Sequence, residues 1–114
     1  MSFAAAKVLT QAAKLLEERG WGQGNDTVNT ADAGGAMCAN LALGHASIRV
    51  DPKDYAAYSY AQGALLRHLS IPVPHMSTKA SVIIAWNDAE GRTVEEVVQA
   101  LNDTAVKVMA EASA

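Results

Sequence analysis

The chain has 114 residues, of which half are hydrophobic and 18% are charged. This length suits one compact domain, and the high apolar content argues against intrinsic disorder. Since no apolar run reaches the roughly 20 residues that a membrane helix needs, we predict no membrane contact. Twelve acidic and nine basic residues leave a net charge of −3, which argues against binding nucleic acid through its phosphates.

The composition also indicates a compartment and a fold class. The single cysteine, Cys38, excludes an internal disulfide and fits a reducing compartment, so we predict a cytoplasmic protein. Alanine, the strongest helix former, is abundant throughout the chain. The sequence therefore predicts an all-α fold: a compact, bundle-like single domain over residues 1–114 with about five helices.

The first helix is predicted over residues 2–19, where apolar residues recur at helical spacing. Ser2 is the expected N-cap, and Gly20 sits where a glycine in the left-handed conformation ends a helix. The polar, glycine-rich stretch that follows, residues 22–31, predicts a loop.

A second helix is predicted to end at about residue 46, with Thr30 or Asp32 as its N-cap. Within this helix, large and small apolar side chains recur at the offsets 0, 4, 7 and 11, which lie on one helix face. The residues at these offsets, and hence the predicted buried face, are Met37, Leu41, Gly44 and Ile48.

A third helix is predicted over residues 52–69, with Asp51 as N-cap and Pro52 as the first helical residue. Its predicted inner stripe is Tyr58, Ala61, Leu65 and Leu69. Positions 58 and 60 diverge by about 200° around a helix, so Tyr60 is predicted to face away from the core. Single exposed tyrosines are common in monomers, but tyrosine is also enriched at interfaces. We therefore predict a weak homodimer with Tyr60 near the contact.

Residues 78–86 contain the β-branched run S-V-I-I-A-W, which fits either a buried strand or a short helix. No partner strand is apparent, so a short helix capped by Ser77 or Thr78 is predicted. A turn is predicted after it, over residues 87–92. The next four residues, T-V-E-E at 93–96, form a capping box that starts the last predicted helix, 94–111. The predicted inner face of that helix is Val94, Val97, Val98, Leu101, Ala105 and Val108.

Four side chains could ligate a soft metal, namely Cys38, His45, His68 and His75. Cys38 and His45 share one helix face, but the close pairs of structural zinc sites, such as C-x-x-C, do not occur. A nucleophilic Cys38 would need a helix N-terminus and a nearby cation, whereas its position inside an alanine-rich stripe predicts burial. We therefore predict no metal, no cofactor and no catalytic residue.

Two loops and one helix pair invite further functional interpretations. Residues 22–26 lack the lysine and the spacing of a phosphate-binding loop, and residues 87–91 lack the alternating carboxylates of a calcium loop. Residues 77–111 have the outline of a helix-turn-helix, which would imply DNA binding. The polar face of its last helix is acidic, opposed by Lys107 alone, which argues against that function; its acidic residues are Glu95, Glu96, Asp103 and Glu111.

Two stretches carry a family resemblance: L-L-E-E-R-G-W-G-Q-G at residues 15–24 and W-N-D-A-E-G-R-T-V-E-E-V at residues 86–97. Together they resemble a family of small uncharacterised proteins, a domain of unknown function, from actinobacteria and their bacteriophages. Members carry a cysteine- and alanine-containing helix, to which residues 35–39 are similar. Members often have a cysteine where this chain has Gly22, so any paired-cysteine or metal role would lack half of its ligands here. The resemblance implies a phage or mobile-element origin and brings no activity.

The two motifs also suggest a candidate site. Each tryptophan ends a predicted helix beside a polar turn, so the motifs can be turn-and-cap devices or can line a groove for a ligand or partner. The residues of that candidate site are Trp21, Gln23, Trp86, Asn87, Asp88 and Arg92. We predict a non-enzymatic protein that binds a host or viral protein. The alternatives are a small-molecule binder or enzyme with a pocket near Trp21 and Trp86, and a helix-turn-helix DNA-binding protein.

Overall fold

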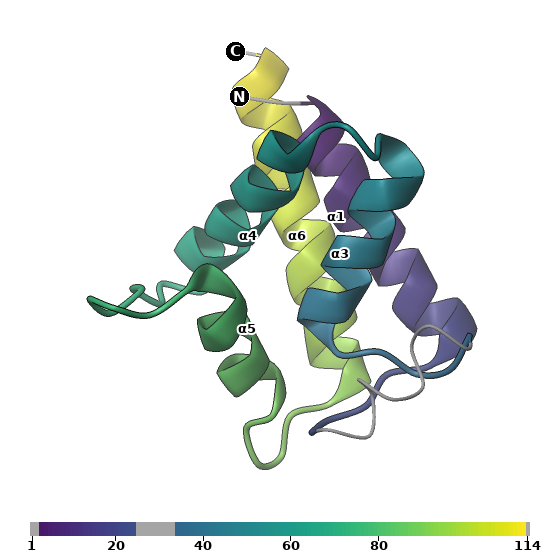
Figure 1. Ribbon diagram of the computed structural model, residues 1–114, viewed down its shortest axis with the longest axis vertical. Coiled ribbons are helices and arrows are strands. Elements are labelled where there is room, and N and C mark those ends of the chain that lie inside the picture. The colour runs from purple at the N-terminus through teal and green to yellow at the C-terminus, as the bar shows by residue number, and fades with distance from the viewer. Residues whose placement is uncertain (1–2, 25–33, 114) are drawn as a thin grey trace.

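A computed structural model describes residues 3–24 and 34–113. These ranges contain no strand, only helices and an isolated β-bridge between Trp21 and Met37. The helices, labelled as in Figure 1, are α1 (Phe3–Arg19), α3 (Ala39–Val50), α4 (Tyr55–His68), α5 (Lys79–Asn87) and α6 (Val94–Ser113). The predicted all-α fold is confirmed. The predicted caps Ser2, Thr30 and Asp32 lie outside the described residues.

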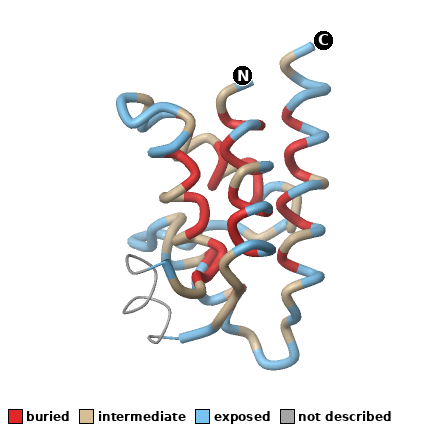
Figure 2. Tube along the Cα trace, turned by 90° about the vertical axis from the view of Figure 1, so that its right-hand side faces the viewer, coloured by how far each residue is buried: buried red, intermediate tan, exposed pale blue. Residues whose placement is uncertain are grey.

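Helix α1 contacts α3, α4 and α6, and α5 packs on α3 and α4. Figure 1 shows α1 and α6 side by side, with the first turn of α1 and the last turn of α6 at the same end. The buried residues face inward along the helices in Figure 2 and form one core to which all five helices contribute. Its largest fully buried side chains include Leu9, Leu15, Leu43, Leu65, Ile83 and Leu101.

The end of α1 follows the sequence prediction. Gly20 has a φ of +97°, a conformation that glycine adopts without steric cost, and its N–H donates to Leu16 O at 3.0 Å. The chain then runs alongside a later segment, because Met37 N donates to Gly20 O at 3.1 Å and Gly22 N donates to Met37 O at 3.2 Å. These two bonds tie the chain on either side of Trp21 to Met37, just before α3.

The predicted face of α3 is largely wrong: of its four residues only Met37 is fully buried, and Met37 lies before the helix. Met37 precedes the helix because its N–H and C=O pair with the segment around Trp21, and Ile48 is 63% exposed. The prediction counted helical offsets from Met37, which does not belong to the helix, whereas the small side chains of α3 allow the closest approach to α1. The residues that α3 buries are Ala39, Ala42, Leu43, Ala46 and Ser47.

Helix α4 begins three residues later than predicted. Asp54 is its N-cap and accepts a hydrogen bond from Ala57 N at 3.0 Å. Asp51 instead ends α3, and its side chain accepts from Lys53 N at 2.9 Å, so Asp51 to Asp54 form a turn with Pro52 at its second position. Aspartate followed by proline is as favourable in such a turn as at a helix start. The residues that α4 buries are Ala57, Ala61, Gln62, Ala64, Leu65 and Leu66.

The tyrosines of α4 also differ from expectation. Tyr58 and Tyr60 are both partly buried against the core, and the Arg67 guanidinium lies 5.4 Å from the centre of the Tyr60 ring. Two tyrosines on opposite sides of one helix can both be covered because α4 has α1, α3 and α6 on some sides and α5 on another. Tyr55, at 73% exposure, is the tyrosine that faces solvent.

The two last helices are confirmed together with their caps. Thr78 caps α5, where it exchanges hydrogen bonds with Ser81, so the β-branched run is helical. The capping box at the start of α6 is present: Glu96 N donates to Thr93 Oγ1 at 3.2 Å, and Thr93 N donates to Glu96 Oε1 at 3.3 Å. In the predicted inner face of α6, Val97, Leu101, Ala105 and Val108 are buried and Val94 and Val98 are partly buried.

Candidate functional site

Asn87, the last residue of α5, is completely buried and holds three segments of the chain together. Its Oδ1 accepts from Trp21 Nε1 at 2.6 Å and from Ala39 N at 2.9 Å, and its Nδ2 donates to Gly22 O at 3.1 Å and to Asp88 Oδ1 at 3.0 Å. Ala39 is the first residue of α3, so Asn87 satisfies one of the backbone N–H groups that a helix start leaves without a partner. We call this arrangement the Asn87 joint.

A second set of hydrogen bonds surrounds the joint. Gln23 Nε2 donates to Asn87 O at 2.9 Å and to Ala89 O at 3.0 Å, and Gly24 N donates to Asp88 Oδ1 at 3.0 Å. The structure therefore brings four of the six predicted site residues together, namely Trp21, Gln23, Asn87 and Asp88.

The other two predicted site residues, Trp86 and Arg92, form a separate contact beside the joint. The Arg92 guanidinium lies 4.6 Å from the centre of the Trp86 ring, and its Nε donates to Trp86 O at 3.0 Å. Its Nη1 also pairs with Glu96 Oε2 at 2.9 Å. Arg92 thus connects the end of α5 to the first turn of α6.

The Arg92–Glu96 pair predicts a pH dependence. The hydrogen bond from Arg92 lowers the pKa of Glu96 below its ordinary value of 4.5, aided by the charge of Arg92 and by Thr93. A carboxyl with a lower pKa in the folded chain stabilises the fold above its ordinary pKa and stops doing so as the pH falls through its folded-state pKa. We expect Glu96→Gln to be less stable than the wild type near neutral pH, with the difference shrinking in acid.

Urea unfolding of both proteins near neutral pH and at about pH 3 measures this change. Glu95→Gln, one residue earlier on the exposed side of α6, is the matched control. A stability difference for Glu96→Gln that stays constant between the two pH values contradicts the prediction.

The candidate residues are brought together mainly by bonds to one another. All four hydrogen-bonding positions of the Asn87 amide are used within the chain. A groove of about 450 Å³ lies next to the joint, between the end of α1 and the start of α6, and Trp21 is the candidate residue that lines it; its lining is Leu16, Glu17, Gly20, Trp21, Val94, Glu95 and Val98. The Asn87 joint is therefore a structural connection between the segment after α1, the start of α3 and the end of α5.

Cys38 lies at the N-terminus of α3, outside the helix in which it was predicted. It is the N-cap, and its Sγ accepts from Leu41 N at 3.5 Å. Its thiol is buried and free of disulfides, as the sequence indicated. His68 Nδ1 meets Lys107 Nζ at 2.8 Å, and His75 is exposed. Within residues 3–24 and 34–113, no three His, Cys, Asp or Glu side chains are grouped to hold a metal ion.

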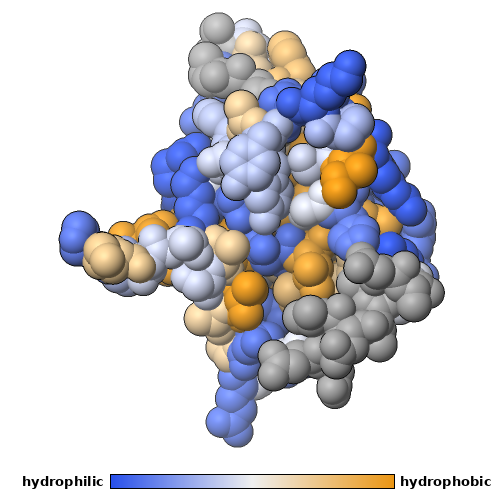
Figure 3. All heavy atoms as spheres, viewed as in Figure 1, coloured by the Kyte–Doolittle hydropathy of each residue, from blue (hydrophilic) through white to orange (hydrophobic). Residues whose placement is uncertain are grey.

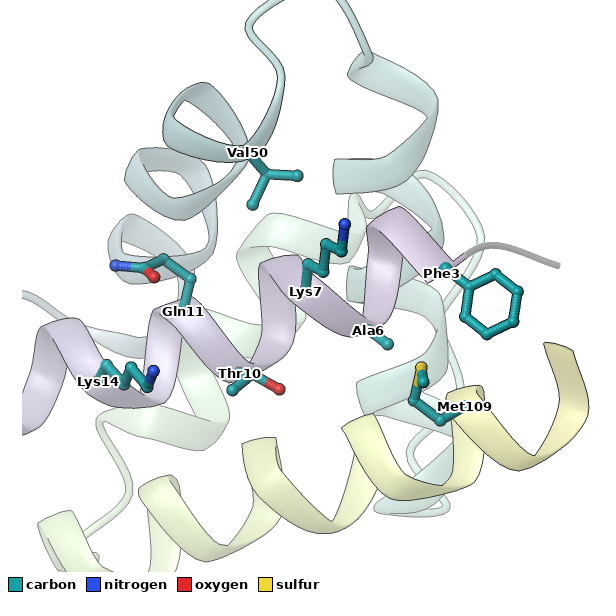
Figure 4. Close-up of a pocket in the computed structure, with 8 residues that line it drawn as sticks. All are labelled: Phe3, Ala6, Lys7, Thr10, Gln11, Lys14, Val50 and Met109. Atoms are coloured by element: carbon teal, nitrogen blue, oxygen red, sulfur yellow. The ribbon is translucent and has the colours of Figure 1, made fainter. Parts of the chain in front are cut away.

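The sequence did not predict an open hollow on the described surface. It lies over the outer side of α1, between the end of α3 and the last turns of α6, and has a volume of about 790 Å³. Figure 4 shows its lining, with Val50 on one side of α1 and Met109 on the other. We call it the α1 groove; its residues are Phe3, Ala6, Lys7, Thr10, Gln11, Lys14, Val50 and Met109.

Large apolar side chains border the α1 groove and remain accessible. Phe3 is 50% exposed and Met109 is 43% exposed, and in Figure 4 they lie next to each other at one end. Ala6, on the same side of α1, is almost completely buried and is too small to fill the space between Phe3 and Met109. By contrast, the face in Figure 3 carries hydrophobic residues in small patches separated by hydrophilic ones.

A third groove, of about 370 Å³, lies between α3 and α4 and includes Tyr55, Tyr58, Asn40 and Ile48. The Tyr55 and Tyr58 rings meet edge to face, 5.6 Å apart, and Asn40 Nδ2 donates to the Tyr58 hydroxyl at 3.2 Å. Burial raises the pKa of Tyr58 above its ordinary value of 10.0, although the Asn40 hydrogen bond acts in the opposite direction. We call this the α3–α4 groove.

These features define a small all-α protein with an internal hydrogen-bonded joint and an open apolar groove. The chain belongs to a family of unknown function, DUF6197, whose model matches residues 2–107. This match confirms the resemblance to an uncharacterised family that the two motifs indicated. No match was found among curated proteins or among solved structures. Each helix of the described ranges is too short or too polar to cross a bilayer.

Proposed function

We propose that this protein is a non-enzymatic binding module that holds a helical segment of a partner protein in the α1 groove. One observation carries the proposal: Phe3 and Met109 are large, half exposed and adjacent, and they flank a hollow whose floor is the small side chain of Ala6. Exposed apolar residues that border a concavity are typical of protein-binding surfaces, whereas scattered ones are normal on any surface.

The proposed partner is a protein of the host cell or of a virus, met in the host cytoplasm. The phage and actinobacterial distribution implied by the family resemblance supports this origin, and the buried free thiol of Cys38 fits a reducing compartment. The Asn87 joint supports the module indirectly, because it fixes how α3 and α5 sit against the end of α1. Since its amide groups pair within the chain, partner binding at the α1 groove is favoured over ligand binding between Trp21 and Trp86.

The proposal is tested by affinity capture from a lysate of the source organism with three baits: the wild type, Met109→Asp and Ile48→Asp. Both substitutions add one charge at an exposed apolar residue, but only Met109 lines the α1 groove. We expect at least one protein that the wild type and Ile48→Asp retain and that Met109→Asp loses. Recovery of the same proteins with all three baits contradicts binding through this groove.

Self-association remains a separate proposal. The predicted weak homodimer placed Tyr60 at the contact, but the exposed apolar side chains near α4 are Tyr55 and Ile48, at 73% and 63% exposure. We expect sedimentation at increasing concentration to show a rise in mass above 11.9 kDa. Tyr55→Ser should weaken the association if the α3–α4 groove forms the contact, and Tyr60→Ser should do so if the original placement holds. A constant mass up to high micromolar concentration removes the dimer.

A further inference from the structure

We infer that the helix bound in the α1 groove is amphipathic and acidic, with carboxylates about two turns apart beside its apolar face. This inference rests on the proposed function and adds the chemistry of the partner. It follows from three properties of the groove: its helical walls, its apolar floor and border, and two lysines on its rim.

The walls of the groove select a helix as occupant. The groove is built from α1, the end of α3 and the last turns of α6. Apart from the groups at the helix ends, the backbone N–H and C=O groups of these walls bond within their own helices. An extended peptide needs a free backbone edge with which to pair, and helical walls offer none. A bound helix satisfies its own backbone and presents only side chains, so it fits such a surface.

The apolar lining fixes one face of the bound helix. Val50 lies on one side of α1 and Phe3 and Met109 lie on the other, while Ala6 forms the floor. Side chains of a bound helix at positions i, i+3 or i+4, and i+7 form a stripe that can contact all of these residues. The hollow above Ala6 is where one large apolar side chain of that stripe would insert.

The rim supplies positive charge. Lys7 and Lys14 are exposed and seven residues apart on α1, with Gln11 between them, so they lie on one face at a separation of about 10 Å along the axis. Within the described part of the chain, neither ammonium group has a hydrogen bond or an ion pair. The acidic residues of α1, Glu17 and Glu18, follow Lys14 and do not line the groove.

This charge is opposite to that of the whole chain, which is −3. Two carboxylates spaced seven residues apart on the partner would meet Lys7 and Lys14, while a basic helix would leave both lysines facing like charges. Two cations on a concave surface are also fewer than a nucleic-acid backbone or an anionic membrane surface normally engages. The groove therefore favours an acidic protein segment.

The inference is tested with a displayed library of helical peptides in which the solvent-facing positions vary freely between acidic, basic and neutral residues. Selection on the wild type should enrich peptides with two acidic residues seven positions apart beside an apolar stripe. Affinities of the enriched peptides are then measured by fluorescence anisotropy against four proteins: wild type, Lys7→Glu, Lys53→Glu and Met109→Asp. Lys53 is exposed and lies outside the groove, so its reversal is the matched control for charge.

We expect Lys7→Glu to weaken binding about tenfold or more, Lys53→Glu to change it less than about twofold, and added salt to reduce the difference. A double Lys7→Glu, Lys14→Glu variant should instead select basic peptides.

Three results overturn the inference in distinguishable ways. Peptides that lose affinity for Met109→Asp but show no acidic pattern and no response to Lys7→Glu contradict the charge recognition and leave the proposed function standing. Enriched peptides that bind Met109→Asp as well as they bind the wild type contradict both. Binding of the wild type to anionic phosphatidylserine vesicles, lost in Lys7→Glu, with no peptide enriched, identifies a membrane-surface site instead.

Discussion

Replacing Asn87 with alanine is expected to lower the free energy of unfolding by about 3 to 5 kcal/mol. The substitution removes the acceptor of Trp21 Nε1 and Ala39 N and the donor to Gly22 O. Ala39 is fully buried, so water does not easily replace the lost partner of its N–H. Each buried polar group left without a partner costs roughly 1–3 kcal/mol. Unfolding in urea, followed by tryptophan fluorescence and by circular dichroism, measures the loss.

Asn102→Ala is the matched control for this substitution, because Asn102 is an exposed asparagine on α6. Its replacement by a better helix former should leave stability within about 0.5 kcal/mol of the wild type or raise it slightly. If Asn87→Ala unfolds at the same urea concentration as Asn102→Ala, the joint contributes little and the hydrogen bonds of the Asn87 amide are replaceable.

Leu101→Ala is expected to cost roughly 2–5 kcal/mol, the range observed for leucine truncation in well-packed cores. Leu101 is completely buried at the middle of α6, where this helix packs along α1. Removing its side chain loses apolar burial and leaves a cavity that rigid neighbouring helices cannot close. Chemical unfolding at equilibrium measures the change.

Val106→Ala controls for the effect of an alanine on α6, since Val106 is 68% exposed on the same helix. We expect this variant to change stability by less than about 0.5 kcal/mol. Equal losses for the two variants would mean that the assigned inner face of α6 is wrong.

The fold could be predicted from the sequence where local signals act alone. Gly20 ends α1, and Thr93 with Glu96 starts α6, through contacts made within a few residues. The start of α3 could not be predicted, because Met37 pairs with a backbone segment some sixteen residues earlier. Its buried face was missed for a related reason: alanines are core residues here because α1 approaches closely, and their size gives no sign of this.

The candidate site, like the fold, could be predicted from the sequence only in part. The polar turn residues were found because Trp21, Asn87 and Asp88 belong to recognisable motifs, although their bonds to one another could not be derived from spacing. The α1 groove was missed because Phe3, Val50 and Met109 are far apart in the sequence and share no motif. One signal was available: Met109 is a large apolar residue outside the inner stripe of α6.

The Asn87 joint also has a consequence for the order of folding. Three of its four hydrogen bonds connect residues 48 to 66 positions apart, so each of these three requires the closure of a long loop. Such contacts form only after α1 and α5 have reached their places, and they are expected to be weak or absent in the folding transition state. The stability lost in Asn87→Ala should therefore appear mainly as faster unfolding, with little change in the refolding rate. The Asn87 joint therefore slows unfolding and so lengthens the lifetime of the folded chain.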